Sequence, residues 1–318
     1  MRNLQNRSAI LLVGGRGTRL APLTNNTPKP MLQVAGVPFT EHQIIKARDA
    51  GISEIVLATS FKAELFEPYF GDGSNFGISI KYAVEEVALG TGGAISNAAQ
   101  ELSGTGAIAI FNGDVLSGHD LSAQFDSHEA NSADVTLFLT KVEDARAYGA
   151  VELDESGRVS AFNEKMENPP TNIINAGCYI FNRDVINTIP FGKVVSVERE
   201  TFPNLLATGA RVFGFIDTSY WLDIGTPSAL LKASRDLVLE GGKEFMALEG
   251  SEISPSASIT GGTVIGRKAQ IAAGAQISGC VIGDGAIIGA GARLTDCFVA
   301  EGFEVPAQVI SFDNYFGY

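Results

Sequence analysis

The chain has 318 residues, 45 % of them hydrophobic and 19 % charged, and a formal net charge of −13 at pH 7. This length allows two domains with a sizeable core, and the acidic balance argues against nucleic acid or an anionic membrane surface as a partner. Three widely spaced cysteines, no Cys/His cluster, no signal segment and no apolar run near the roughly 18 residues of a membrane helix predict a cytoplasmic protein without disulfides.

A glycine-rich turn follows the first predicted strand. Residues 9–13 are a short apolar run, which predicts a buried strand, and the sequence GGRGTRL (14–20) comes directly after it. Glycines let backbone N–H groups approach a phosphate, and Arg19 and Lys29 add positive charge beside them. No Gly-Lys-Ser/Thr closes the turn, so it is not a P-loop, and Arg19 replaces the third glycine of a dinucleotide fingerprint. We therefore predict a site for a phosphate-bearing ligand.

Strands and helices alternate from residue 9 to about residue 240, which predicts a mostly parallel sheet covered by helices. A helix is expected at Thr40–Ala50, ended by Gly51. Further strands are expected at Ile55–Ala58, Ile80–Val84, Ala107–Phe111, Val135–Leu139, Arg158–Phe162 and Val212–Phe215. Ligands of such sheets bind beyond the carboxyl ends of strands, so the glycine-rich turn and Asn112-Gly113-Asp114 are expected to converge there.

Aliphatic residues recur every six positions near the C-terminal end. The repeat positions are Ile253, Ile259, Ile265, Ile271 and Ile277 and, after a slip of one residue, Ile282, Ile288 and Leu294. Such a repeat suits a triangular solenoid of about three turns whose apolar residues point inward. Thr263, Cys280 and Cys297 fall at matching places, and we interpret them as small core residues rather than a redox or metal pair.

The stretch from Gly14 to Glu41, GGRGTRLAPLTNNTPKPMLQVAGVPFTE, resembles the signature of the sugar-1-phosphate nucleotidyltransferases. The resemblance covers nearly all of residues 8–300 and implies a Rossmann-like α/β catalytic domain at residues 1–240. After a linker at 241–251, residues 252–300 resemble the hexapeptide left-handed β-helix that follows this domain in many members of the family.

The resemblance also implies roles for individual residues. The catalytic residues would be Arg19, Lys29 and Asp114. The nucleotide would contact Leu12, Gly14, Gly15, Gly17, Thr18, Glu85, Gly90 and Thr91. The sugar phosphate would contact Asn112, Gly149, Glu164, Lys165 and Asn175. Asp114 and Asp223, each of which alone could equally be a turn or cap residue, would hold Mg²⁺ against the phosphates.

Glu85 stands where the family reads the base, a few residues before Leu89-Gly90-Thr91. Uridylyl- and thymidylyltransferases carry Gln at this place. Guanine presents adjacent N1–H and N2–H donors, which suit an ionised carboxylate that only accepts hydrogen bonds. Glu85 therefore favours GTP over UTP or dTTP, although a solvated acidic pair with Glu86 remains the alternative interpretation.

The segments INAGCYIF, VVSVERETFP and SYWLDIGTP resemble bacterial guanylyltransferases that act on mannose 1-phosphate. This resemblance implies GTP and mannose 1-phosphate as substrates. The alternatives are guanylyl transfer to another sugar such as manno-heptose 1-phosphate, thymidylyl or uridylyl transfer to glucose 1-phosphate, and a non-catalytic regulatory subunit. The intact phosphate and metal residues argue against the regulatory subunit.

Three further expectations concern regions without a role in the chemistry. The aromatic-rich tail, 301–318, is expected to cap the solenoid or to contact another subunit. A homo-oligomer is expected, with no nucleic acid or membrane partner. His42, His119 and His128 are expected at the surface.

Overall fold

The computed structural model describes residues 7–318, which form two compact units. One unit holds the residues up to Gly15 together with 40–222, and the other holds 16–39 together with 223–318. Segment 16–39 groups with the C-terminal part because it packs on a helix there, so this grouping does not follow the predicted division at residue 240. That division stays a prediction about where the sequence pattern changes.

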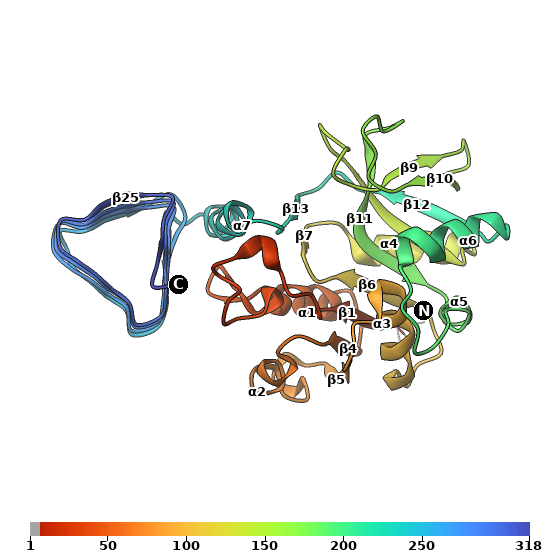
Figure 1. The fold of residues 1–318 in the computed structure, drawn as a ribbon, viewed down its shortest axis with the longest axis horizontal. Coiled ribbons are helices and arrows are strands. Elements are labelled where there is room, and N and C mark those ends of the chain that lie inside the picture. Colours follow the sequence, from red (N-terminus) through yellow and green to blue (C-terminus); the bar gives the residue numbers. More distant parts are fainter. Residues whose placement is uncertain (1–6) are drawn as a thin grey trace. The chain divides into compact units, whose positions relative to one another are not determined.

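The first unit is built on a nine-stranded sheet (Figure 1). Its strands are β1 (Ser8–Leu12), β4 (Glu54–Thr59), β5 (Ser79–Val84), β6 (Ile108–Asn112), β8 (Val135–Lys141), β9 (Ala150–Leu153), β10 (Val159–Asn163), β11 (Ile173–Phe181) and β12 (Val212–Ile216). The order is β10-β9-β11-β6-β1-β4-β5, and β8 pairs with both β11 and β12. Strands β1, β4, β5 and β6 run parallel, whereas β11 runs antiparallel to β6 and β8. The predicted α/β fold class is confirmed.

Helices connect the strands of this unit. They are α1 (Phe39–Asp49), α2 (Glu67–Phe70), α3 (Gly90–Ala98), α4 (Leu121–Ala130), α5 (Arg183–Ile186) and α6 (Phe202–Ala207), with single turns η4 (Ala63–Leu65), η5 (Ser74–Phe76) and η6 (Ala99–Glu101) and a π-turn η7 (Val197–Thr201). The predicted helix at 40–50 is α1, and Gly51 ends it with a φ of 82° that glycine adopts without strain. Asp120 begins α4 by accepting from the Ala123 N–H at 2.9 Å.

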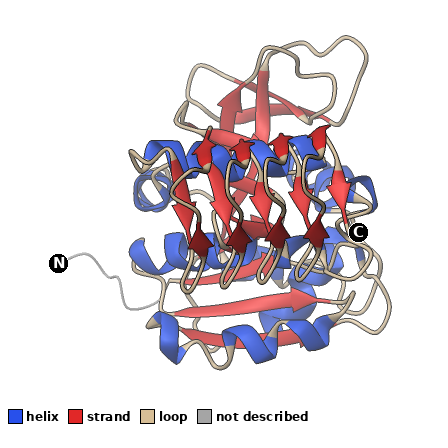
Figure 2. Cartoon of the chain, turned by 90° about the vertical axis from the view of Figure 1, so that its left-hand side faces the viewer, coloured by secondary structure: helices blue, strands red, loops and turns tan. Residues whose placement is uncertain are grey.

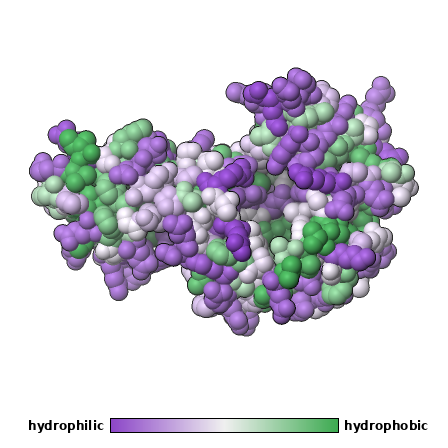
Figure 3. All heavy atoms as spheres, in the orientation of Figure 1, coloured by the Kyte–Doolittle hydropathy of each residue, from purple (hydrophilic) through white to green (hydrophobic). Residues whose placement is uncertain are grey.

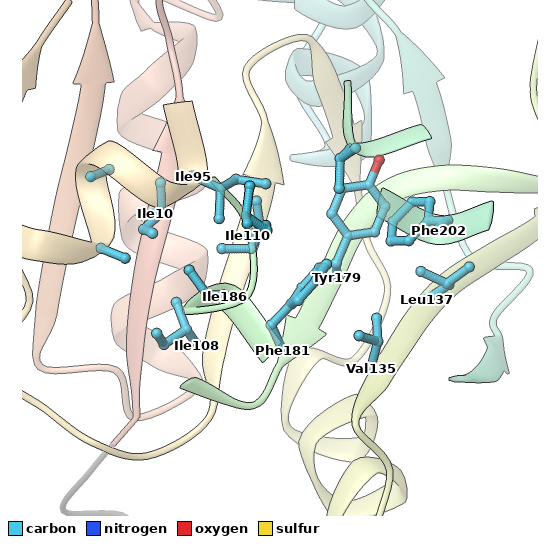
Figure 4. Close-up of a cluster of buried hydrophobic side chains, with 14 of the residues drawn as sticks. Ile10, Ile95, Ile108, Ile110, Val135, Leu137, Tyr179, Phe181, Ile186 and Phe202 are labelled. Atoms are coloured by element: carbon cyan, nitrogen blue, oxygen red, sulfur yellow. The ribbon is translucent and has the colours of Figure 1, made fainter. Parts of the chain in front are cut away.

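The core of the sheet combines aliphatic and aromatic side chains (Figure 4). Ile10 and Ile110, on the neighbouring strands β1 and β6, are fully buried. Continuous apolar runs of this kind arise because helices cover both faces of a parallel sheet. Burial of each such side chain contributes about 1.5–3 kcal/mol.

Two of the three histidines are buried, which corrects the expectation that they lie at the surface. His119 is 2 % exposed and His128 is 3 % exposed. The His119 ring stacks on Phe138 with a centroid separation of 3.9 Å, and its Nε2 lies 3.1 Å from Gln124 Oε1. Burial lowers the pKa of His119 to about 3. Satisfied hydrogen bonds at both ring nitrogens allow the neutral imidazole to serve as a core side chain.

The second unit begins at Arg16, within the glycine-rich motif. Segment 16–39 forms η2 (Thr18–Leu20), η3 (Lys29–Met31) and a hairpin of β2 (Gln33–Val34) and β3 (Val37–Pro38). It packs on α7 (Pro227–Glu240), where the Ala35 N–H donates to Ser234 Oγ at 2.7 Å. Thr226 caps α7 by accepting from the Ala229 N–H.

The remainder of the second unit is a parallel β-helix of triangular cross-section (Figure 1). One face stacks β14 (Phe245–Ala247), β17 (Thr263–Ile265), β20 (Val281–Ile282), β23 (Phe298–Val299) and β26 (Tyr315–Phe316). The second stacks β15 (Glu252–Ile253), β18 (Gln270–Ile271), β21 (Ile287–Ile288) and β24 (Glu304–Val305), and the third stacks β16 (Ser258–Thr260), β19 (Gln276–Ser278), β22 (Arg293–Thr295) and β25 (Ile310–Phe312). Figure 2 shows these coils stacked side by side.

The predicted hexad residues form the interior of the β-helix. Ile271 stacks on Ile288, and Ile277 stacks on Leu294, and all four side chains are at most 3 % exposed. Thr263, Cys280 and Cys297 form a buried column, in which the Cys297 N–H donates to Cys280 Sγ at 3.4 Å. The predicted core role of these residues is confirmed, and all three cysteines of the chain are free thiols.

The tail forms another coil of the β-helix rather than a separate cap. Strands β24, β25 and β26 pair in parallel with β21, β22 and β23. Ser311 lies beside Leu294 in this stack, so a polar residue stands where the six-residue repeat would have an aliphatic one. The repeat in the sequence therefore does not identify this coil. The outward-facing Ile310 and Phe312 remain 76 % and 69 % exposed.

Hydrophilic side chains predominate on the face of the molecule drawn in Figure 3, with apolar residues in smaller patches. Within residues 7–318, every helix is too short or too polar to span a membrane.

Candidate functional site

The carboxyl ends of β1 and β6 lie side by side in the first unit. Leu12 is paired with Asn112, so the turns after these two strands leave the sheet at one edge. A Cβ atom on Gly113 would lie 2.2 Å from the Leu12 carbonyl oxygen, which only glycine avoids. The predicted convergence of the glycine-rich turn and the Asn112-Gly113-Asp114 turn is confirmed for the residues up to Gly15.

The two glycines that begin the turn have different surroundings. A Cβ atom on Gly14 would lie 2.7 Å from Ser60 Oγ, and this hydroxyl donates to the Gly14 carbonyl oxygen at 2.6 Å. No atom lies within 4 Å of a Cβ built on Gly15. The Gly14 backbone is therefore held from the side of β4, while the space beside Gly15 is open. Ser60 was not predicted from the sequence.

The glycine-rich motif from Arg16 onward belongs to the second unit. Gly17 has a φ of 63°, and a Cβ atom there would lie 2.7 Å from the Lys29 Cβ. Thr24 Oγ1 donates to the Gly17 carbonyl oxygen at 3.0 Å, which closes the loop between Gly17 and Lys29. Lys29 is 9 % exposed. The positive φ and the close approach explain why glycine follows Arg16.

Arg19 and Asp223 meet at Gly225 within the second unit. Both terminal guanidinium nitrogens of Arg19 and the Oδ1 of Asp223 lie 3.2 Å from a Cβ built on Gly225. A side chain at this position would press on both charged groups. The sequence predicted roles for Arg19 and Asp223, and the structure brings them to one place although 204 positions separate them in the sequence (223 − 19).

Glu85 follows β5 and begins the loop that leads to α3. Its Oε2 accepts from the Leu89 N–H at 3.2 Å, while its Oε1 is buried without a hydrogen-bond partner among residues 7–318. Burial raises the pKa of Glu85, and the Leu89 N–H partly offsets this effect. Glu85 is therefore half-buried, and the described residues supply a donor to only one of its two carboxylate oxygens.

The first turn of α3 is anchored by η7 and the residues before it. The Gly92 N–H donates to the Val195 carbonyl oxygen at 2.8 Å, and the Thr91 hydroxyl donates to Glu198 Oε2 at 3.0 Å. The Thr91 hydroxyl therefore holds the start of α3 against η7. Glu198 lies far along the chain, and no sequence signal connected it with Thr91.

A second group of predicted residues gathers around β9, β10 and β11. A Cβ atom on Gly149 would lie 3.0 Å from Glu164 Oε2, and the Gly149 carbonyl oxygen accepts from the Asn175 N–H at 2.8 Å. Lys165 lies next to Glu164 with a 3.8 Å ion pair and a 61 % exposed side chain. An exposed pair of this kind contributes little to stability, so the Lys165 ammonium group can change its orientation at low cost.

Trp221 fixes the strand that leads to Asp223. Its Nε1 donates to the Ala176 carbonyl oxygen at 3.0 Å, and its ring meets Tyr148 edge-to-face with centroids 5.4 Å apart. The strand β13 (Trp221–Asp223) pairs with β7 (Val115–Ser117), which follows Asp114 directly. The first residue of the Trp-Leu-Asp segment thus serves as an anchor within the first unit.

Asp114 and Asp223 each carry a carboxylate, the type of ligand that suits a hard divalent cation. Within the described residues, no group of three or more His, Cys, Asp or Glu side chains could hold a metal by itself. Mg²⁺ in nucleotide sites is typically bound by one or two carboxylates, with phosphates and water completing the shell. Asp114 and Asp223 offer such carboxylates.

The sequence of this chain is similar to two protein families and to several known proteins. Residues 8–239 match the family model "Nucleotidyl transferase", and 262–296 match "Bacterial transferase hexapeptide (six repeats)". The chain is 51 % identical over 281 residues to a mannose-1-phosphate guanylyltransferase of Mycobacterium tuberculosis, covering 85 % of this chain and 78 % of that one.

Two further proteins are similar over the catalytic region. A D-glycero-alpha-D-manno-heptose 1-phosphate guanylyltransferase of Aneurinibacillus thermoaerophilus is 36 % identical over 229 residues, which cover 72 % of this chain and 97 % of that one. The crystal structure of HddC from Yersinia pseudotuberculosis complexed with GMP-PN has a TM-score of 0.62 at 28 % identity and covers 73 % of this chain and 99 % of that one. The chain therefore belongs to the nucleotidyl transferase family and carries hexapeptide repeats after the nucleotidyl transferase region.

Proposed function

We propose that this protein transfers the guanylyl group of GTP to mannose 1-phosphate and releases pyrophosphate. The observation that carries the choice of base is Glu85, whose Oε1 is a buried acceptor without a partner in residues 7–318. Guanine offers two adjacent N–H donors to such a carboxylate, whereas uracil and thymine would present carbonyl oxygens to it. The 51 % identity to a mannose-1-phosphate guanylyltransferase supports the choice of sugar.

In the proposed reaction, a phosphate oxygen of mannose 1-phosphate attacks the α-phosphorus of GTP. The new P–O bond forms as the bond to pyrophosphate breaks, so no covalent enzyme intermediate is needed. Arg19 would hold the departing pyrophosphate, Lys29 would neutralise charge on the transferring phosphates, and Lys165 would orient the attacking phosphate. Catalysis then consists of positioning and charge neutralisation.

The remaining predicted residues would bind the substrates. The backbone at Gly14, Gly15 and Gly17 would contact the nucleotide phosphates, with Leu12, Thr18 and Gly90 beside the nucleotide. Asn112, Gly149, Glu164 and Asn175 would surround the sugar. These assignments follow the family resemblance, and Leu12 and Asn112 stand at the carboxyl ends of the neighbouring strands β1 and β6.

Nucleotidyl transferases of this family generally depend on a divalent metal ion. We propose Mg²⁺, held by Asp114 and Asp223, because magnesium suits a set of few carboxylates and several phosphate oxygens. When bound, the ion neutralises phosphate charge. A cytoplasmic location and a homo-oligomer remain predictions.

A turnover assay on the purified protein tests the proposal. GTP, UTP, dTTP and ATP are combined in turn with mannose 1-phosphate, manno-heptose 1-phosphate and glucose 1-phosphate, and pyrophosphate release is measured. The proposal expects the highest kcat/KM for GTP with mannose 1-phosphate. A higher kcat/KM with manno-heptose 1-phosphate would favour the second candidate, which the 36 % identity to a manno-heptose 1-phosphate guanylyltransferase supports. Preference for UTP or dTTP would refute the role of Glu85.

A further inference from the structure

Tyr179 carries a hydroxyl group in the core beneath the predicted sugar-binding residues. The side chain lies on β11, is fully buried, and meets Phe181 and Phe202 edge-to-face with centroids 6.3 Å and 5.2 Å apart (Figure 4). A phenylalanine would make the same ring contacts. A buried hydroxyl costs free energy unless it is hydrogen-bonded, so the oxygen needs a separate explanation.

The Tyr179 oxygen accepts hydrogen bonds from two side-chain amides. Asn175 Nδ2 lies 2.9 Å away and Asn112 Nδ2 lies 3.3 Å away. The oxygen of the Asn175 side-chain amide is also fixed, because Oδ1 accepts from the Gly177 N–H at 3.2 Å. One phenol oxygen therefore joins the end of β6 to the middle of β11.

This arrangement leaves one acceptor unused. With Nδ2 of Asn112 directed at Tyr179, the Oδ1 of the same amide faces elsewhere, and it is buried without a hydrogen-bond partner in the described part of the chain. A buried carbonyl oxygen without a donor is unfavourable, and such groups in native proteins call for an explanation. A donor supplied by a bound ligand would satisfy it.

The backbone around these residues is built for the arrangement. The register of β11 against β8 shifts between Asn175 and Tyr179, and Gly177 within the shift has a φ of 79°. A Cβ atom on Gly177 would lie 3.2 Å from Asn112 Nδ2 and 2.8 Å from Val115 Cγ2. Bulges of this type re-aim side chains next to functional sites.

We propose that Tyr179 is a positioning residue whose hydroxyl orients the Asn112 and Asn175 amides, so that Asn112 Oδ1 accepts a hydrogen bond from a hydroxyl of the hexose 1-phosphate. The acceptor is neutral, so it reads a hydroxyl donor without repelling the phosphate as a carboxylate would. Burial raises the pKa of Tyr179 far above its usual value, so the phenol stays neutral as well. This inference rests on the proposed function and adds a determinant of its sugar specificity.

The variant Tyr179→Phe removes the oxygen and keeps the ring. The KM for mannose 1-phosphate is expected to rise by about two- to tenfold, the range of one ordinary hydrogen bond, and the KM for GTP to stay unchanged. The preference for mannose 1-phosphate over its C2 epimer glucose 1-phosphate is expected to narrow by the same factor. The control is Tyr82→Phe, which removes a hydroxyl that donates to the Gly71 carbonyl oxygen at 2.7 Å, on the edge strand β5.

A second measurement does not depend on turnover. The side-chain amide protons of Asn112 and Asn175, observed by NMR, are expected to exchange with solvent faster in Tyr179→Phe than in the parent protein and in Tyr82→Phe. If the parent protein fails to use mannose 1-phosphate, the proposed function is wrong, and the positioning role is judged by amide exchange alone. Unchanged exchange overturns the positioning role. With an active parent protein, equal rises in the KM of both substrates also overturn it, because they indicate general damage to the fold.

Discussion

The Thr91 hydroxyl donates a hydrogen bond of 3.0 Å to Glu198 Oε2 across 107 positions of sequence. The same hydroxyl accepts from the Val197 N–H at 2.8 Å. The first turn of α3, where the nucleotide is predicted to bind, is thereby attached to η7. Neither residue needs to touch a substrate for this contact to affect nucleotide binding.

The first prediction is that Glu198→Ala weakens this attachment. Glu198 Oε2 also accepts from the Ser196 hydroxyl at 3.3 Å, so the substitution removes two hydrogen bonds. The free energy of unfolding is expected to fall by about 1–3 kcal/mol, and the KM for GTP to rise by about two- to tenfold because the α3 turn loosens. Urea denaturation and steady-state kinetics measure the two effects. Glu198→Gln, which keeps an acceptor oxygen, is the matched control. Parent-like stability and KM in Glu198→Ala would show that the contact has no such role.

The second prediction concerns Glu85 and the base. Glu85→Gln is expected to lower kcat/KM for GTP by about one to two orders of magnitude, because a charge-assisted hydrogen bond is lost, and to narrow the gap to UTP. Glu86→Gln is the neighbouring control. An unchanged ratio of GTP to UTP use in Glu85→Gln would remove Glu85 from the base site.

The pH dependence of GTP use provides a further check on Glu85. Burial raises the pKa of this carboxyl above its ordinary value of 4.5. The ionised form accepts from guanine, so on acidification the affinity for GTP should decline at a higher pH than for an exposed glutamate. This decline should be absent in Glu85→Gln.

The third prediction concerns the carboxylates assigned to Mg²⁺. Asp114→Asn and Asp223→Asn are each expected to reduce turnover by about two orders of magnitude or more at saturating Mg²⁺, with the fold retained. Calorimetric titration of Mg²⁺ in the presence of GTP should show weaker binding in both variants. Asp72→Asn, at an exposed site before η5, serves as the control. Normal turnover in either variant would contradict the assignment.

The fourth prediction concerns the β-helix. Truncation of the buried side chain in Ile271→Ala is expected to cost about 2–5 kcal/mol through lost burial and a residual cavity. Gln270→Ala, at the exposed neighbouring position, is expected to stay within about 0.5 kcal/mol of the parent protein. Chemical denaturation measures both changes. Equal stability of the two variants would contradict the inward and outward assignment along β18.

The fifth prediction concerns acid stability. The pKa of His119 is about 3 in the folded protein, against 6.5 for an unperturbed histidine. As the pH falls below 6.5, the unfolded chain takes up a proton that the folded chain does not, so His119 reduces stability progressively between about pH 6.5 and pH 3. His119→Gln should show a shallower loss of stability over this interval in denaturation experiments. An identical slope in both proteins would argue against a neutral, buried imidazole.

Several parts of the protein could be predicted from local sequence alone. The apolar run before Gly14 predicted β1, and the six-residue repeat predicted a solenoid whose Ile271 and Ile288 point inward. Both predictions succeeded because the patterns are local: a fully buried strand is a continuous apolar run, and a hexad coil repeats an aliphatic residue every six positions. The glycine-rich motif likewise identified the family, because close backbone approach requires glycine at fixed positions.

Other features were decided only by the tertiary structure. The strand β11 was not predicted, because Asn175-Ala176-Gly177 looks like a turn, whereas the structure places it in a bulge within the strand. The burial of His119, the contact of Thr91 with Glu198 and the joining of two amides by Tyr179 each depend on residues from different elements. Local patterns record the period of one element, but hydrogen bonds between distant elements depend on how the sheet brings those elements together, and no single segment of the sequence contains that information.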